Sequence, residues 1–225
     1  MSIQIGLYDF FAYTLPGVLL VAALIYAGAS LSLFQLNFQQ LNELSTPITL
    51  IGIGISYILG MLLEPIAKRW YRLIQPKGRT KEIFKEFKAL HPNFVVNVRP
   101  EEAGLMRAYI KQKNLELALD IEKNGATSKM LRNFSFVFLI LTLILMLNWF
   151  SHSFQILYLV ALCFTTFLSF VAAYESTKFD RWFHYLTLES IAAFSLEPSE
   201  HVMIKDFLTA QQPDQAMLRT KNKIE

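Results

Sequence analysis

Residues 154–173 read FQILYLVALCFTTFLSFVAA, twenty consecutive residues without a charged side chain. An α-helix rises ~1.5 Å per residue, so this stretch is long enough as a helix to cross the ~30 Å hydrocarbon core of a bilayer. A second uncharged stretch, LPGVLLVAALIYAGASLSL, occupies residues 15–33. Both stretches therefore predict membrane-spanning helices.

Two further apolar runs are shorter. One covers 48–63 and is prolonged by Ile66 and Ala67, and the other covers 134–150. Thr46 and Pro47 supply a capping hydroxyl and a proline at the first helical position, which favour a helix start there. The sequence therefore predicts an all-α fold, an integral membrane four-helix bundle with cytoplasmic helical extensions.

The basic residues predict the orientation of these spans. Residues 1–67 contain no Lys or Arg, whereas 15 of the 21 basic residues lie between Lys68 and Arg132 and the other six follow Tyr174. Loops rich in Lys and Arg stay in the cytoplasm. Four spans put both basic regions on one side, but three or five spans would expose some of them outside. We therefore expect both termini in the cytoplasm.

The chain divides into four parts on this interpretation. Residues 1–67 hold an interfacial helix and the first two spans, with Pro16-Gly17 turning the chain into the membrane. Residues 68–132 form a basic cytoplasmic helical segment, and 133–174 hold the last two spans. Residues 175–225 form a cytoplasmic helical tail with a disordered end, because its last residues are polar.

The middle segment is expected to be helical with one interruption. The pattern predicts a helix over 81–90, a short extended piece over 93–98 and a new helix from Pro100, since proline favours a first helical turn. A further helix from Leu115 is expected to join the third span almost continuously. Its Asn124-Gly125 step is the one weak point.

The tail is expected to continue as a helix from Ser176 until Pro198, with a short helix after Ser199 and disorder beyond Gln211.

Charge differs between the two cytoplasmic parts. Residues 64–132 carry 15 basic and 8 acidic side chains, a net +7, and residues 174–225 carry 6 basic and 8 acidic, a net −2. Opposite charges favour docking of these parts, within one chain or between subunits, although an undocked solvated surface is equally compatible.

Few polar residues fall inside the spans. Glu64 lies one turn before Lys68, and an i,i+4 ion pair would satisfy it locally. Asn148 is expected to be wetted at the outer interface. A group of small hydroxyl side chains is expected to bond back to its own helix, namely Thr165, Thr166 and Ser169. We therefore expect no row of acids for an ion or proton relay.

The second span carries small residues four positions apart. Gly52, Ser56 and Gly60 fall on one helix face, which lets another helix backbone approach closely. This stripe is the predicted helix-packing site, against a helix of the same chain or of another subunit.

A cluster of basic residues follows the second span directly. This position predicts contact with anionic lipid headgroups or with a partner protein, although the cluster also serves as the topology signal alone. Direct nucleic-acid binding is not expected, since no binding motif or stacking platform accompanies it. The predicted contact residues are Lys68, Arg69, Arg72, Lys77, Arg79 and Lys81.

Several ringed side chains, with one acid among them, fall at predicted span ends, where amphipathic rings prefer the membrane interface. The predicted interfacial anchors are Tyr8, Asp9, Phe10, Phe11, Trp70, Trp149 and Trp182. No metal-ligand spacing appears among the four histidines, and no serine lies in a nucleophile elbow. We therefore expect no catalytic residue, no cofactor and no metal.

Two short segments resemble known membrane proteins. Tyr8-Asp9-Phe10-Phe11 followed by Leu15-Pro16-Gly17 is similar to the opening of many small bacterial membrane proteins, and the SKMLRN segment at 128–133 resembles their junction between a helix and a span. Several such proteins come from antiviral defence loci, among them Kiwa membrane subunits and retron transmembrane effectors. The resemblance covers about 20 residues. It implies a membrane subunit that binds a cytoplasmic sensor and, when triggered, oligomerises or perturbs the bilayer.

The sequence thus favours a non-enzymatic effector or anchoring subunit of a bacterial inner membrane. Its expected partners are anionic lipids, further copies of itself and a cytoplasmic protein. Two other classes stay open. A small channel or transporter subunit is the first, although inverted repeats and buried charges are lacking. A membrane enzyme is the second, with Glu64, Asp180 and His184 as its best candidate residues.

Overall fold

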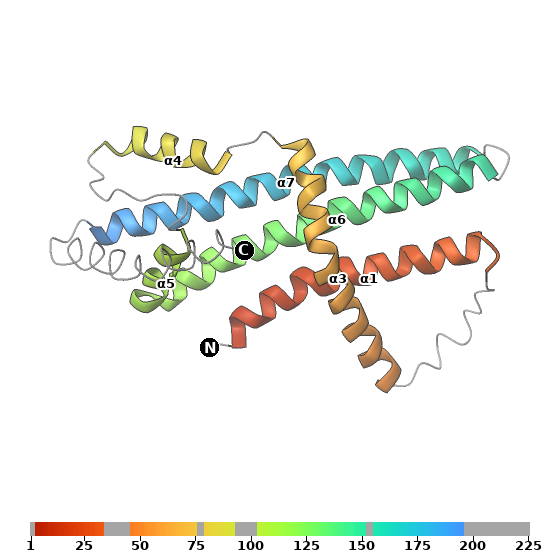
Figure 1. Ribbon diagram of the computed structural model, residues 1–225, viewed down its shortest axis with the longest axis horizontal. Coiled ribbons are helices and arrows are strands. Elements are labelled where there is room, and N and C mark those ends of the chain that lie inside the picture. The colour runs from red at the N-terminus through yellow and green to blue at the C-terminus, as the bar shows by residue number, and fades with distance from the viewer. Residues whose placement is uncertain (1–2, 34–45, 76–78, 93–102, 152–154, 196–225) are drawn as a thin grey trace, which may run out of the picture. The chain divides into compact units, whose positions relative to one another are not determined.

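The computed structural model describes residues 3–33, 46–75, 79–92, 103–151 and 155–195. Within these ranges it contains helices and no strand, which confirms the all-α fold (Figure 1). The helices are α1 (Ile3–Ser30), α3 (Thr46–Ile74), α4 (Arg79–Leu90), α5 (Ala103–Lys113), α6 (Leu115–Ser151) and α7 (Ile156–Ser195).

Four of these helices are long and apolar enough to cross a membrane, which confirms the four predicted spans. They cover Leu7–Ser30, Thr46–Ile74, Leu115–Ser151 and Ile156–Phe194. The chain is therefore a multi-pass membrane protein. The helix from Leu115 does run into the third span without a break, because Asn124 and Gly125 lie inside α6. The extended piece at 93–98 and the tail beyond 195 lie outside the described residues.

The chain forms two compact units. Unit 1 comprises Met1–Lys77 and Gly125–Asp180, and unit 2 comprises Gly78–Asn124 and Arg181–Glu225. Unit 1 therefore contains α1, α3 and the apolar parts of α6 and α7. Unit 2 contains α4, α5 and the remaining parts of α6 and α7. These two long helices belong to both units.

In unit 1, α6 and α7 meet along a seam of small hydroxyl residues spaced seven apart on α6. Ser128 and Ser176 each donate to the other's carbonyl oxygen, at 3.0 and 2.9 Å. Ser169 donates to the Ser135 carbonyl at 2.8 Å, so the prediction that it bonds its own helix was wrong. The third rung joins Thr142 and Thr165 at 2.9 Å. The descending numbers on α7 show that the two helices are antiparallel.

Ser176→Leu is expected to destabilise unit 1, because Ser176 is fully buried against the backbone of α6 and leaves no room for a larger side chain. Overpacking of this kind costs ~1–3 kcal/mol. For a chain of this size that lowers the thermal midpoint by about 2–12 °C. Ser151→Leu is the matched control, since Ser151 is exposed and bonds only its own helix turn at Leu147. If the two variants had equal thermal midpoints in nanodiscs, the hydroxyl seam between α6 and α7 would be contradicted.

The α1 and α3 helices meet where both carry glycine (Figure 1). A Cβ on Gly17 would overlap the carbonyl oxygen of Ser56, and a Cβ on Gly60 would overlap that of Tyr13. The two backbones are therefore in direct contact there. The helix α1 continues through Pro16, so the predicted turn of the chain at Pro16-Gly17 was wrong.

A small apolar cluster joins this helix pair to α6. Its buried members are Leu20 of α1, Leu63 of α3 and Val137 of α6. Unit 1 is thus assembled from two pairs, α1 with α3 and α6 with α7. The first pair is held by direct backbone contact, and the second by hydroxyl side chains that bond across the seam. The cluster lies between the pairs.

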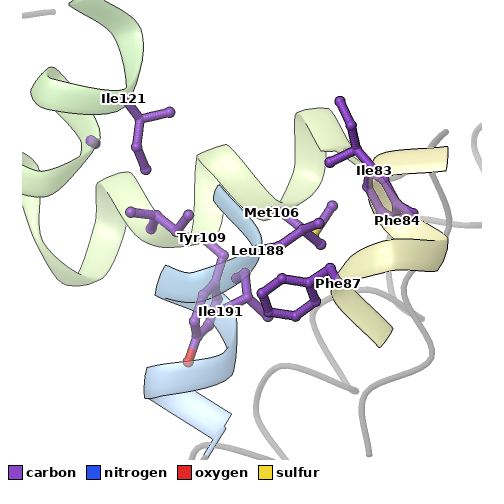
Figure 2. Close-up of a cluster of buried hydrophobic side chains, with 10 residues drawn as sticks. Ile83, Phe84, Phe87, Met106, Tyr109, Ile121, Leu188 and Ile191 are labelled. Carbon is purple, nitrogen blue, oxygen red and sulfur yellow. The ribbon is translucent and has the colours of Figure 1, made fainter. Parts of the chain in front are cut away.

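Unit 2 has a hydrophobic core of its own. Figure 2 shows Phe87 of α4 beside Met106 of α5 and beside Leu188 and Ile191 of α7. Ile83 and Phe84 of α4 belong to the same core. The other buried members are Tyr109, Ile110, Ala118 and Ile121. The middle segment and the tail thus dock within one chain, as the charge difference suggested. The contact is mainly apolar. In its ion pair, Arg181–Glu86 at 2.6 Å, the basic residue belongs to the net-acidic tail and the acidic residue to the net-basic middle segment.

Candidate functional site

An ion pair joins the two helix pairs of unit 1 at the basic end of the spans. Arg132 Nη2 lies 3.0 Å from Glu64 Oε1, and its side chain is only 11% exposed. The Tyr13 hydroxyl donates to the other oxygen of the same carboxylate at 2.5 Å. The predicted Glu64–Lys68 pair was therefore wrong. Lys68 is exposed, while Glu64 bonds to residues of α1 and α6.

Arg132 is held from a second side as well. Its guanidinium carbon lies 5.9 Å from the centre of the Tyr71 ring, which is buried. A guanidinium over an aromatic face is attracted by the ring quadrupole. We refer to Tyr13, Glu64, Tyr71 and Arg132 as the polar junction. It brings together α1, α3 and α6 at the basic end of the spans.

A second ion pair adjoins the polar junction one turn away on α6. Lys129 Nζ lies 3.1 Å from Asp9 Oδ1, and both side chains are over a third exposed. An exposed pair of this kind contributes little stability. The pair instead sets the register between the two helices, because it determines which turn of α1 faces which turn of α6. Asp9 was predicted as an interfacial anchor, and this contact places it against α6.

The end of α3 is bonded to the α6–α7 pair through longer side chains. Trp70 Nε1 donates to Ser135 Oγ at 3.2 Å, and the hydroxyls of Tyr71 and Thr177 lie 3.1 Å apart. Gln75 Nε2 also donates to Thr177. Trp70, predicted as an interfacial anchor, is therefore half-buried and bonded to a neighbouring helix.

At the opposite end of the spans, a single amide joins α6 to α1. Asn148 is buried and donates to the Tyr26 hydroxyl at 3.2 Å and to Ser30 Oγ at 3.0 Å. The expectation that Asn148 is merely wetted was therefore wrong. Asp9 and Ser30 are separated along α1 by about 30 Å, the thickness of a hydrocarbon core. Polar contacts thus occur at both ends of the apolar length.

Asn148→Leu is expected to loosen the α1–α6 contact at this end. The change leaves the hydroxyls of Tyr26 and Ser30 without their amide donor and costs ~1–2 kcal/mol, the range for such bonds in membranes. Thermal unfolding of the protein in nanodiscs measures the loss. Leu147→Asn, a change at an exposed neighbouring position, tests whether altered polarity alone has the same effect. An unchanged midpoint for Asn148→Leu would contradict the contact.

The three members of the predicted packing stripe, Gly52, Ser56 and Gly60, do not share the same surroundings. Ser56 and Gly60 face α1, at Gly17 and Tyr13, so their packing partner belongs to the same chain. A Cβ on Gly52 would meet nothing within 4 Å. Ser56 Oγ donates back to the Gly52 carbonyl at 2.8 Å. The structure therefore separates Gly52 from the other two members of the stripe.

The predicted headgroup contacts remain exposed where they are described, at Lys68, Arg69, Arg72 and Lys81. Arg79 is the first residue of α4, its side chain is outside the described part, and Lys77 lies outside the described residues. Among the predicted anchors, Tyr8, Phe11 and Trp182 are exposed, Phe10 stacks on Tyr57 at 5.4 Å, and Trp149 is half-buried. Contact with headgroups stays a prediction.

The polar groups of unit 2 are spread around its core. Arg107 lies with its guanidinium carbon 4.9 Å from the Phe183 ring centre, and burial lowers the pKa of Arg107, which the nearby Glu122 carboxylate partly offsets. The His184 ring lies 5.2 Å from that of Phe183. Among the described residues, no three His, Cys, Asp or Glu side chains come close enough together to hold a metal ion.

Arg132 is the main residue that the sequence interpretation missed. A signal for it was present, because Glu64 is the acid nearest a span end and Arg132 is the last base before the next span. Pairing the two across the bundle was as reasonable as pairing Glu64 with its own helix.

No protein-family model matches the chain, and comparison with curated proteins and with solved structures also finds no match.

Proposed function

We propose that this chain is a non-enzymatic subunit of a bacterial inner membrane that holds a cytoplasmic protein partner on unit 2 and acts on the bilayer through unit 1. One observation carries the proposal. The helices α6 and α7 each contribute to both units without a break in the helix. The same two helices therefore form part of the membrane unit and part of the proposed partner-binding unit.

The orientation is part of the proposal. Unit 2 and both termini lie in the cytoplasm, because the basic residues gather at one end of the spans. Within the described spans, Lys129 and Arg132 lie at that end, and Asn148 lies at the other. The exposed bases of α3 then lie at headgroup depth, where each contributes ~1 kcal/mol of attraction to anionic lipids.

The polar junction couples the two parts in this proposal. Arg132 lies on α6, eight residues beyond the point at which α6 leaves unit 2, and it binds Glu64 of α3. A partner that turns or pulls α6 is therefore expected to alter this ion pair together with the neighbouring Lys129–Asp9 pair. The charged groups of the junction bind one another rather than a cleft, which supports an assembly role over chemistry.

Assembly of several copies is also part of the proposal. The side chains of residues 46–55 on α3 are exposed in one chain, and Gly52 and Gly54 leave space above the backbone. This half of α3 offers the helix of a second copy a close approach, as small residues do in membranes. The resemblance of 8–17 and 128–133 to defence-locus proteins supports antiviral defence as the setting.

A membrane-potential measurement tests the effector role. Induction of the chain in cells carrying a voltage-sensitive dye is expected to depolarise the inner membrane. The control is Gly60→Leu, expressed to the same level in the membrane, which should lose the α1–α3 contact and the depolarisation with it. An intact potential at every expression level of the unaltered chain, with or without its neighbouring genes, would remove the effector role.

Phage challenge of the native host tests the defence setting separately. Deletion of the gene is expected to raise plaque formation by at least one phage by about tenfold or more, and re-expression of the full chain should reverse the change. Equal plaque numbers across a broad phage panel would contradict the defence setting and leave the membrane-potential result to stand alone.

A further inference from the structure

Asn133 of α6 is buried without a partner. Its side chain is fully buried, and neither its amide oxygen nor its amide nitrogen has a hydrogen-bond partner. Burial of an amide costs free energy unless hydrogen bonds compensate it. The Nε of the adjacent Arg132 is buried without a partner as well. The described packing thus leaves the amide of Asn133 unsatisfied beside the polar junction.

Asn148 on the same helix provides the contrast. It is also buried, but it donates to two hydroxyls of α1. A buried asparagine of α6 therefore finds partners at one end of the α1–α6 contact and none at the other. The packing of the helices, rather than the residue type, accounts for this difference.

The two helix pairs of unit 1 differ in how they are held. In the α1–α3 pair the two backbones touch at Gly17 and Gly60, and in the α6–α7 pair serine hydroxyls bond directly to the opposite backbone. At the basic end of the spans, the contacts between the pairs run through long side chains such as Lys129, Arg132 and Trp70. Long side chains follow a small displacement without losing contact, and touching backbones do not. Movement within unit 1 is therefore easiest between the pairs.

The helix α1 carries a candidate acceptor for the Asn133 amide. The contacts Asp9–Lys129 and Ser30–Asn148 join residues 120 and 118 positions apart, so α1 and α6 are parallel with a steady register. This register places Asn133 level with the turn of α1 around Ala12. Pro16 has no N–H, and the carbonyl of Ala12 therefore lacks its usual helical donor. Ala12 is itself buried.

We propose that unit 1 has a second packing, in which the α6–α7 pair is displaced as a body against the α1–α3 pair and the Asn133 amide donates to the Ala12 carbonyl. This packing pairs the buried Asn133 amide, which has no partner in the described packing, with a carbonyl that lacks its usual helical donor. The long side chains of the Asp9–Lys129 and Glu64–Arg132 ion pairs follow this displacement and limit its extent. The inference rests on geometry alone and stands whether or not the effector role does.

Spin-label distances in nanodiscs test the proposal on the full chain, with Cys163, its one native cysteine, replaced by serine so that only introduced cysteines carry labels. Labels at Leu24 of α1 and Phe170 of α7 report the separation between the pairs, and labels at Leu147 and Phe170 report the α6–α7 pair alone. The native background is expected to give two distance populations between the pairs and one within the pair. A single population between the pairs would overturn the proposal without any further variant.

Two substitutions identify the groups. Asn133→Leu is expected to abolish the second population and to raise the thermal midpoint by about 2–4 °C or more, because it removes an unsatisfied amide. Asn148→Leu, its matched control, lowers the midpoint. Pro16→Ala restores a helical donor to Ala12 and should also abolish the second population. A second population that persists in Asn133→Leu overturns the proposal, and one that persists only in Pro16→Ala overturns Ala12 as the acceptor.

Discussion

Gly60→Ala is expected to destabilise the membrane unit more than any other single methyl group added to α3. The new Cβ would overlap the Tyr13 carbonyl oxygen, which is part of the α1 backbone and cannot turn away. The helices must separate, and the Tyr13–Glu64 hydrogen bond beside the contact is lost with them. Overpacking against rigid groups costs ~2–3 kcal/mol, or about 4–12 °C of thermal midpoint in a chain of this length.

Gly52→Ala and Gly54→Ala are the matched controls, because a Cβ at either position meets nothing within 4 Å. Alanine favours a helix over glycine by ~1 kcal/mol, so these variants should be unchanged or slightly more stable. Tryptophan fluorescence during heating in nanodiscs measures all three. If Gly60→Ala behaved like Gly52→Ala, the backbone contact between α1 and α3 would be refuted.

Arg132→Met is expected to cause the second large loss. The substitution leaves the Glu64 carboxylate, 27% exposed, without its cation near the membrane. Removing one partner of a buried ion pair costs ~3–5 kcal/mol, and the partial exposure of Glu64 reduces this to about 2–3 kcal/mol. The double variant Glu64→Gln with Arg132→Met should recover part of the loss, since no charge then stays unpaired.

Lys68→Met distinguishes this account from a local ion pair on α3. Lys68 lies four residues after Glu64 and is exposed. An exposed i,i+4 pair contributes only ~0.3–0.5 kcal/mol, so Lys68→Met should leave the thermal midpoint nearly unchanged. If Lys68→Met lowered the thermal midpoint as much as Arg132→Met, this would indicate that Glu64 pairs with Lys68 on its own helix, and the polar junction would be refuted.

The helices were predictable because their signals are local. Length without charge predicts a span, and the step from Leu90 to the proline at 92 ends α4 where helical periodicity stops. The error at Pro16 has a physical origin. A proline removes one hydrogen bond from a membrane helix, and neighbouring helices tolerate the loss, so α1 continues through it.

The polar contacts were harder to predict because their partners are distant in sequence. Glu64 and Arg132 are 68 residues apart, and Asn148 lies 118 residues from Ser30. Local rules connect an acid to the nearest base on its own helix face, and they assign a polar residue near a span end to water. The small-residue stripe was predictable at Ser56 and Gly60. Which of its members faces α1 depends on the crossing point, and the sequence does not contain that information locally.

The central claim is the proposed topology, in which α6 and α7 both cross a membrane, with Asp120 on the cytoplasmic side and Gln155 on the outer side. Single cysteines at Asp120 and at Gln155, which are both exposed, test this topology in the Cys163→Ser background. A membrane-impermeant maleimide applied to intact cells should label the cysteine at 155 and should reach the one at 120 only after the membrane is permeabilised. Labelling of both positions in intact cells, or of neither before permeabilisation, would contradict the account.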